Sequence, residues 1–351
     1  MKILSLGKIS ISEKHPVVLV AEFSDGHMGS LEHAKKLVNA AKKAGADIVK
    51  FQMHFPDDEM VAGVKMWAGD LQKILKKSWF SPEKHATIMR YCKEIGIQYL
   101  CTPFSPKAVD VLHTLGVSGF KTGSGEIYNL PFQRKLAQIS SKTGKPVFIS
   151  TGMCTMKELE ETISIHKKEG SNFLLMNCTS EYPVKNYANV RLNLITKLRK
   201  KFKVYIGQSD HTTDNYTSFA AVVLGARVIE KHFTLNRKGD FPDDFMSLDP
   251  GMFKELADGV RKIEASLKDK GQEKKVTPAE KKIRAWAFHS VVSDIDLKKD
   301  DKIRLGNVRP ARPGWGISAR YLDPLYSKKL IGKKVRKNIP KNTVVRWRDL
   351  Q

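Results

Sequence analysis

The sequence contains no long hydrophobic run. No apolar stretch of the 351-residue chain approaches the roughly 18 residues that a membrane-crossing helix needs, and the first residues lack the continuous apolar core of a signal peptide. We therefore expect a cytoplasmic protein without a membrane partner.

Cysteine is also scarce. The chain has four cysteines, at positions 92, 101, 154 and 178, and their spacings show no pairing. Neither a disulfide framework nor a zinc site built from thiolates is expected. Cys101 and Cys178 fall on predicted strands, where a small buried thiol is the ordinary occupant.

Acidic residues are few relative to basic ones. The chain has 37 Asp and Glu against 61 Lys and Arg, a net charge of +24, and residues 251–351 carry +14 of it. The basic residues are mostly lysines scattered among polar positions, without a zinc finger, a helix-turn-helix signature or an aromatic-interleaved RNA motif. We therefore expect no nucleic-acid partner, although a positive field would help to gather a small anionic substrate.

Eight short apolar runs recur through the first two thirds of the chain. They are rich in Val, Ile, Leu and Phe and show little alternation, as is typical of parallel strands buried on both faces. Helix signals lie between them, such as Ser30 as an N-cap, Ser81 before Pro82, and a capping box of Thr155 and Glu158. The pattern predicts an α/β fold, a (β/α)8 TIM barrel. The runs cover residues 17–23, 46–52, 98–104, 119–125, 146–152, 173–179, 204–211 and 228–234.

Two domains are expected. Residues 1–263 would form the barrel, residues 264–284 a charged linker with Gly and Pro, and residues 285–351 a small β-rich domain. Residues 53–80 are too long for a simple connection and are interpreted as a lid or a subunit contact. Strands of the small domain are expected at residues 288–292, 302–305 and 344–347.

Polar side chains gather at the carboxyl ends of the runs, which meet on one face of a barrel. Lys50 and Lys121, with the hydroxyls of Ser124 and Ser150, suit a phosphate or a phosphate plus a carboxylate. In the alternative interpretation the two lysines form salt bridges inside the barrel.

Two histidines end adjacent runs. His211 and His232 are placed to share one divalent metal, most simply Mn2+, in an otherwise oxygen-lined pocket, and Asp210 beside His211 supports that interpretation. In the alternative, each is a hydrogen-bonded core residue. Three carboxylates remain for acid, base or sugar-hydroxyl contacts, namely Glu22, Glu126 and Asp243.

Several sequence blocks resemble one known family along essentially the whole chain. The blocks are residues 45–52 (GADIVKFQ), 101–105 (CTPFS), 120–126 (FKTGSGE), 149–153 (ISTGM), 178–183 (CTSEYP), 209–212 (SDHT) and 230–234 (EKHFT). On these blocks the chain resembles the sialic acid (N-acetylneuraminate) synthases, which condense phosphoenolpyruvate with N-acetylmannosamine or a related amino sugar. Residues 311–318 and 331–334 resemble the antifreeze-like (SAF) domain of that family.

The resemblance implies a role for each group of residues. Catalysis would involve Glu22, Glu126, His211 and His232, with the two histidines holding Mn2+, Mg2+ or Co2+. Glu126 is our candidate for handling the proton of a water molecule, and in the alternative it only forms hydrogen bonds. Phosphoenolpyruvate would be held by Lys50, Thr102, Lys121, Ser124, Ser150, Ser180 and Ser209. The N-acyl amino sugar would be held by Glu22, Gln52, Tyr182, Asp243 and Arg312.

The resemblance further implies a domain-swapped homodimer in which Arg312 reaches the sugar in the partner's barrel. Departures at Gly26 and Asp244, where the family more often has Asn and His, leave open a 2,4-diacetamido-trideoxy hexose as the acceptor, leading to legionaminic or pseudaminic acid. Two further alternatives are a Schiff-base aldolase using Lys50, Lys121 or Lys231, and a non-enzymatic binding protein with an ice- or glycan-binding tail.

Overall fold

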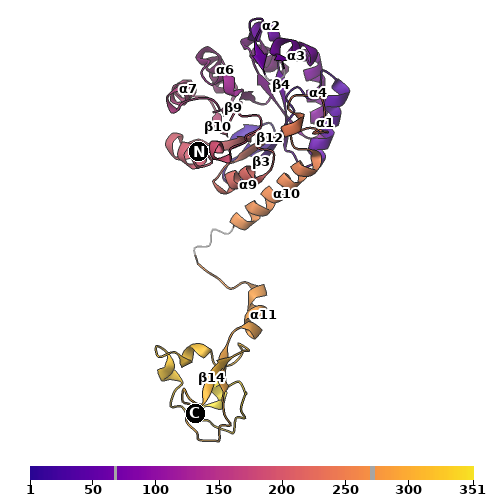
Figure 1. Cartoon of the computed structure of the whole chain (residues 1–351). Helices are drawn as coiled ribbons and strands as arrows, with labels where there is room; N and C mark the ends of the chain where they lie inside the picture. Colours follow the sequence, from indigo (N-terminus) through magenta and orange to yellow (C-terminus); the bar gives the residue numbers. More distant parts are fainter. Residues whose placement is uncertain (67–68, 269–272) are drawn as a thin grey trace. The chain divides into compact units, whose positions relative to one another are not determined.

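A computed structural model describes residues 1–66, 69–268 and 273–351. It contains an eight-stranded parallel sheet in the order β7, β4, β3, β12, β11, β10, β9, β8, and β7 lies beside β8, so that the sheet curves into a barrel. The predicted α/β barrel is therefore confirmed (Figure 1). The strands are β3 (Val18–Glu22), β4 (Ile48–Met53), β7 (Gln98–Pro103), β8 (Phe120–Thr122), β9 (Val147–Ser150), β10 (Phe173–Cys178), β11 (Ile206–Asp210) and β12 (Val228–His232).

Helices cover the outside of the barrel, and those for which the sequence predicts a start begin there. Ser30 accepts a hydrogen bond from the backbone N–H of His33, and Thr155 and Glu158 form the expected capping box. The helices are α1 (Leu31–Lys43), α4 (Pro82–Ile95), α5 (Pro106–Leu115), α6 (Leu130–Thr143), α7 (Met156–Lys168), α8 (Asn193–Phe202), α9 (Tyr216–Val223) and α10 (Pro250–Leu267).

A small hairpin helps to fill the barrel interior. Strands β1 (Leu4–Leu6) and β2 (Ile9–Ile11) pair in antiparallel fashion, and their side chains share a buried cluster with inward residues of the barrel strands. Leu6 and Ile11 are fully buried there, which contributes about 1.5–3 kcal/mol for each side chain. The hairpin thus occupies barrel volume without using the carboxyl ends of the strands.

The long segment after β4 has structure of its own. It contains α2 (Pro56–Glu59), the short strands β5 (Lys65–Met66) and β6 (Gly69–Asp70), and α3 (Leu71–Lys77). This segment supplies part of a cavity wall described below.

The chain divides into two compact units, Met1–Asp269 and Lys270–Gln351. Helix α10 ends at Leu267 and α11 spans Pro278–Ala287, so helical turns occupy both ends of the segment that we predicted to be a linker. No helix in the described part of the chain is both long and apolar enough to cross a membrane.

The second unit has less strand than the sequence suggests. Strand β13 (Ser290–Ser293) overlaps the strand predicted at residues 288–292. It pairs with β14 (Val308–Ala311), a strand that was not predicted. Residues 302–305 and 344–347 each form a single β-bridge and no continuous strand. Their apolar side chains Ile303 and Val345 are nevertheless buried in the core of the unit.

Candidate active site

A cavity of about 620 Å³ opens at the carboxyl ends of the barrel strands. Fourteen of the fifteen predicted site residues line it, although they come from all parts of residues 22–243. The fifteenth, Arg312, belongs to the second unit, where it is exposed and its guanidinium lies 5.9 Å from the centroid of the Trp286 ring. The fourteen are Glu22, Lys50, Gln52, Thr102, Lys121, Ser124, Glu126, Ser150, Ser180, Tyr182, Ser209, His211, His232 and Asp243.

Buried charges of both signs meet at the base of this cavity. Lys50 Nζ lies 2.7 Å from Glu230 Oε1 and 3.2 Å from Glu22 Oε2, and Lys121 Nζ lies 3.6 Å from Glu230 Oε1. Burial alone would raise the pKa of Glu230, but Lys121, Lys50 and the Ser209 hydroxyl hold it well below its usual range. The salt bridges of the alternative interpretation are therefore present, and both lysines also line the cavity, where phosphate binding stays a prediction.

Glu230 is a site residue that the sequence interpretation missed. Residues two apart on a strand share a face, so Glu230 and His232 of β12 both point into the barrel. The alternation of inward and outward side chains along the strand could have identified Glu230, but the prediction considered only residues at the strand ends.

The same alternation corrects the role suggested for Asp210. Its carboxylate accepts hydrogen bonds from Thr217 and Ser218 and lies 3.3 Å from Lys231 Nζ. Neither Asp210 nor Lys231 lines the cavity. Asp210 therefore does not support a metal at His211, and Lys231 is not placed to form an imine with a substrate in this cavity.

Hydroxyl groups form the neighbouring wall. Ser124 Oγ and Ser150 Oγ lie 2.8 Å apart, and the buried Thr102 Oγ1 has no hydrogen-bond partner in the described part of the chain. A Cβ at Gly152 would clash with the hydroxyls of Ser124 and Ser180, so glycine is needed for this close approach. The wall suits an anion that takes several hydrogen bonds.

The two predicted metal ligands lie side by side, with ring centroids 5.2 Å apart. His211 Nδ1 donates to the carbonyl oxygen of Thr179 at 2.7 Å, and His232 Nδ1 lies 3.3 Å from Ser24 Oγ and 3.6 Å from Asp243 Oδ2. Engagement of Nδ1 by an oxygen is the arrangement that presents Nε2 to a metal, and burial with the His211 charge lowers the pKa of His232 toward the neutral form that binds metals.

The protein does not supply a complete coordination sphere by itself. Among residues 1–66, 69–268 and 273–351, no group of three or more His, Cys, Asp and Glu is spaced to hold a metal. Two imidazoles thus fit a catalytic ion that takes its remaining ligands from water or substrate, and they do not fit a closed structural site.

Cys178 differs from the inert buried thiol expected from the sequence. It is half-buried, lines the cavity, and its Sγ lies 3.5 Å from Ser124 Oγ and 3.9 Å from His211 Nδ1. Burial would raise the pKa of the thiol, but His211 and Lys121 outweigh it and lower that pKa to about 6.

Two walls of the cavity differ in character. Gln52 Nε2 donates to Glu22 Oε1 at 2.6 Å, and half-buried Glu126 accepts from Asn129 Nδ2 at 2.8 Å while burial raises its pKa. The segment between β4 and α4 adds an apolar wall, which was not predicted. Its members are Met60, Val64, Met66, Leu71, Ile74 and Leu75.

Asp25 follows β3, lines the cavity and has an unusual titration. Burial raises its pKa to about 6 in spite of His54 and the Ser78 hydroxyl, which lower it. In the unfolded chain the pKa is about 4, so the folded state binds more protons between these values, and this contribution to the free energy of unfolding falls as pH rises from 4 to 6. Asp25→Asn removes the contribution.

We therefore expect urea denaturation to show a wild-type stability that declines relative to Asp25→Asn by about 2–3 kcal/mol between pH 4 and pH 7. Identical pH dependences for the two proteins would show that Asp25 titrates normally.

A parallel barrel with a lysine pair, a hydroxyl wall and two imidazoles around one cavity at the carboxyl ends of its strands has the features of a barrel enzyme that acts on a small anionic molecule. Comparisons with known proteins agree with this class and narrow it. A model of the NeuB family matches residues 37–272.

Individual relatives cover most of the chain. It is 35% identical to the N,N'-diacetyllegionaminic acid synthase of Campylobacter jejuni, over 94% of this chain and 98% of that protein. It is 33% identical to the N-acetylneuraminate-9-phosphate synthase of Homo sapiens, over 82% of this chain and 80% of the human protein. The N-acetylneuraminic acid synthetase structure from Leptospira borgpetersenii matches with a TM-score of 0.70 and 27% identity, covering 80% of this chain and 95% of that one. The chain belongs to the NeuB family, and these relatives are synthases of sialic-acid-type sugars.

Proposed function

We propose that the protein condenses phosphoenolpyruvate with the open-chain aldehyde of an N-acyl amino sugar, giving a nonulosonic acid and inorganic phosphate. The observation that carries this proposal is the single cavity in which Lys50, Lys121 and the hydroxyl wall adjoin the histidine pair. The phosphate and carboxylate of phosphoenolpyruvate would occupy the cationic and hydroxyl side, and the sugar would lie toward Gln52, Tyr182 and Asp243.

The reaction balances with water as the third reactant. C3 of phosphoenolpyruvate bonds to the aldehyde carbon, water adds at C2, and phosphate leaves by cleavage of its C–O bond. A divalent ion held by His211 and His232, most simply Mn2+, would supply Lewis-acid polarisation of the aldehyde oxygen. Lys50 and Lys121 would stabilise the departing phosphate, and Glu126, whose raised pKa suits proton transfer, would accept the proton of the added water.

The cavity wall favours one class of acceptor. Among the described residues, the cavity is lined by two lysines, Lys50 and Lys121, and by no arginine. Because both lysines would hold phosphoenolpyruvate, no further cation is left there to bind a phosphate group on the acceptor. The apolar wall instead suits methyl groups. We therefore favour an unphosphorylated 2,4-diacetamido-trideoxy hexose over N-acetylmannosamine, and hence a legionaminic- or pseudaminic-type product.

A turnover assay with a panel of amino sugars tests this function. Phosphate release from phosphoenolpyruvate should depend on the sugar, with the diacetamido-trideoxy hexose giving the highest kcat/KM. A higher value for N-acetylmannosamine would correct the acceptor, whereas no release with any sugar would overturn the synthase proposal.

Lys121 provides a test of anion binding. Loss of a charge-assisted contact in a buried site costs about 2 kcal/mol, so Lys121→Ala should raise the KM for phosphoenolpyruvate roughly 30-fold. The matched control is Lys333→Ala, which removes an exposed lysine of the second unit and should leave that KM unchanged. Equal losses in the two variants would mean that only the general positive field matters.

We further propose that the active form is a homodimer in which Arg312 contacts the sugar bound in the partner's barrel. Support comes from the family resemblance and from the loop of residues 309–314. Two prolines restrict the backbone of this loop, and Arg312 is exposed on it. A planar guanidinium can hold an N-acyl carbonyl with two donors, which a lysine cannot copy.

A further inference from the structure

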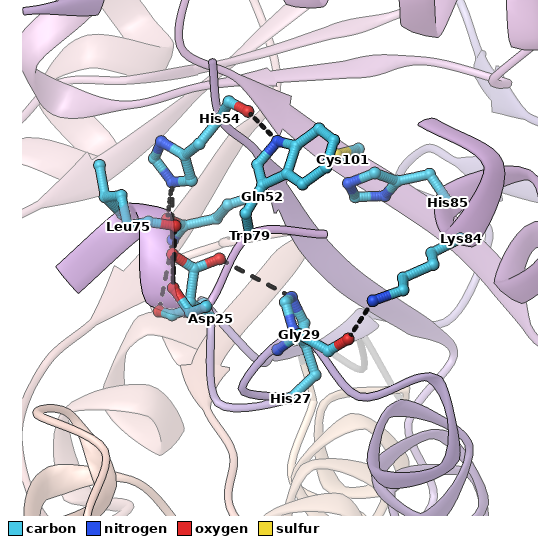
Figure 2. Close-up of polar contacts among 12 residues, drawn as sticks. Asp25, His27, Gly29, Gln52, His54, Leu75, Trp79, Lys84, His85 and Cys101 are labelled. Atoms are coloured by element: carbon cyan, nitrogen blue, oxygen red, sulfur yellow. Dashed lines mark hydrogen bonds and ion pairs between the residues drawn. The ribbon is translucent and has the colours of Figure 1, made fainter. Parts of the chain in front are cut away.

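His54, the residue that follows β4, lies in the cavity wall without a role in the reaction proposed above. It is 8% exposed, and its ring stacks on Phe104 with centroids 4.3 Å apart. The Trp79 indole donates to the carbonyl oxygen of His54 at 3.2 Å, as Figure 2 shows. Phe104 therefore holds the face of the His54 ring, and Trp79 holds the backbone of the same residue.

Both ring nitrogens of His54 face oxygen atoms. Nδ1 lies 2.8 Å from Glu59 Oε2, and Nε2 lies 3.0 Å from Gln52 Oε1 and 3.8 Å from Asp25 Oδ2. Only a doubly protonated ring can donate to both sides. Burial would lower the pKa of His54, but Asp25 and Glu59 raise it, in keeping with an imidazolium.

The Nε2 contact decides how the Gln52 amide is turned. With Oε1 facing His54, Gln52 Nε2 donates to Glu22 Oε1 at 2.6 Å and to Ser24 Oγ at 3.3 Å. Reversal of the amide would set its NH2 against the ring N–H and its oxygen against the Glu22 carboxylate. His54 thus fixes which groups the sugar side of the cavity presents.

The contact between His54 Nδ1 and Glu59 connects the ring to the segment between β4 and α4. Glu59 ends α2, and its Oε1 accepts from the backbone N–H of Phe55. At the other end of the segment, Ser78 Oγ donates to Asp25 Oδ2 at 3.2 Å. The start and the end of the segment that carries the apolar wall are therefore both tied to the cluster around His54.

We propose that His54 is a positioning residue for the acceptor sugar, with Nδ1 holding the wall segment through Glu59 and Nε2 setting the Gln52 amide. The effect of Gln52 on acceptor binding rests on the proposed synthase function. The tie between His54 and Glu59 concerns the structure of the chain alone and does not depend on that function.

Two substitutions separate these two contacts. The amide of Asn reaches the place of Nδ1, whereas the amide of Gln reaches the place of Nε2. His54→Asn should keep the wild-type rates of deuterium exchange in residues 55–66 but raise the KM for the acceptor about tenfold, the scale of one hydrogen bond, with the KM for phosphoenolpyruvate within about twofold of wild type. His54→Gln should show the reverse, with faster exchange in residues 55–66 and an acceptor KM within about threefold of wild type.

A buried histidine outside the cavity is the control. His85 packs against Phe80 and its Nδ1 lies 2.7 Å from the Tyr99 hydroxyl, so His85→Asn reports loss of core contacts alone. The proposal is overturned if the two His54 variants behave alike in both measurements, or if they shift both substrates equally as the His85 variant does. If no sugar is turned over even by wild type, the synthase proposal fails, and deuterium exchange by itself supports or overturns the tie between His54 and Glu59.

Discussion

Removal of divalent metal is expected to abolish turnover, and Mn2+ is expected to restore it. His211→Ala and His232→Ala should each lower kcat by roughly 1,000-fold or more, because Lewis-acid polarisation is worth several kcal/mol in the transition state. The measurement is phosphate release after treatment with a chelator, with and without added Mn2+, Mg2+ or Co2+.

Folding must be separated from chemistry in this test. His113→Ala is the matched control, since His113 is an exposed histidine of α5 outside the cavity, and it should retain wild-type activity and metal dependence. Thermal unfolding should show that all three variants are folded. Full activity of either cavity variant in metal-free buffer would remove the metal from the mechanism.

Mixing of two inactive variants is expected to restore activity. If Arg312 completes the site of the partner, chains with Arg312→Ala and chains with His232→Ala form heterodimers that have one intact site and one site with both defects. After subunit exchange of an equal mixture, half of the dimers are heterodimers, so about a quarter of all sites should be active.

Two comparisons make the mixing experiment decisive. Each variant alone, taken through the same exchange procedure, should stay inactive. If Arg312 serves its own barrel, every site in the mixture carries a defect and no activity returns. A monomer in solution would also contradict the proposed arrangement.

The architecture could be read from the sequence because its signals are local. Each barrel strand is a short apolar run, and caps such as Ser30 and Thr155 mark helix starts within three residues of their hydrogen-bond partners. The second unit was harder, because Ile303 and Val345 are buried in its core although the segments around them form no continuous strand ladder. Apolar composition alone does not distinguish these cases.

Convergence of strand ends was likewise predictable, since all parallel strands of a barrel point to one face. That rule, with the sequence blocks, brought together the residues from Glu22 to Asp243 that line the cavity. It could not say which of two neighbours on a strand faces inward, and so Asp210 was placed in the pocket and Glu230 was left out of it.

The sequence by itself therefore determined the barrel, the family resemblance and fourteen of the residues that line the cavity. Only the tertiary structure decided that Lys50 lies between Glu22 and Glu230, and that His54 lies between Gln52 and Glu59. The physical reason is that strand and helix signals arise from neighbours in the chain. A buried charge takes its partner from whichever strand packs beside it, as Lys50 takes Glu230 across 180 positions of sequence.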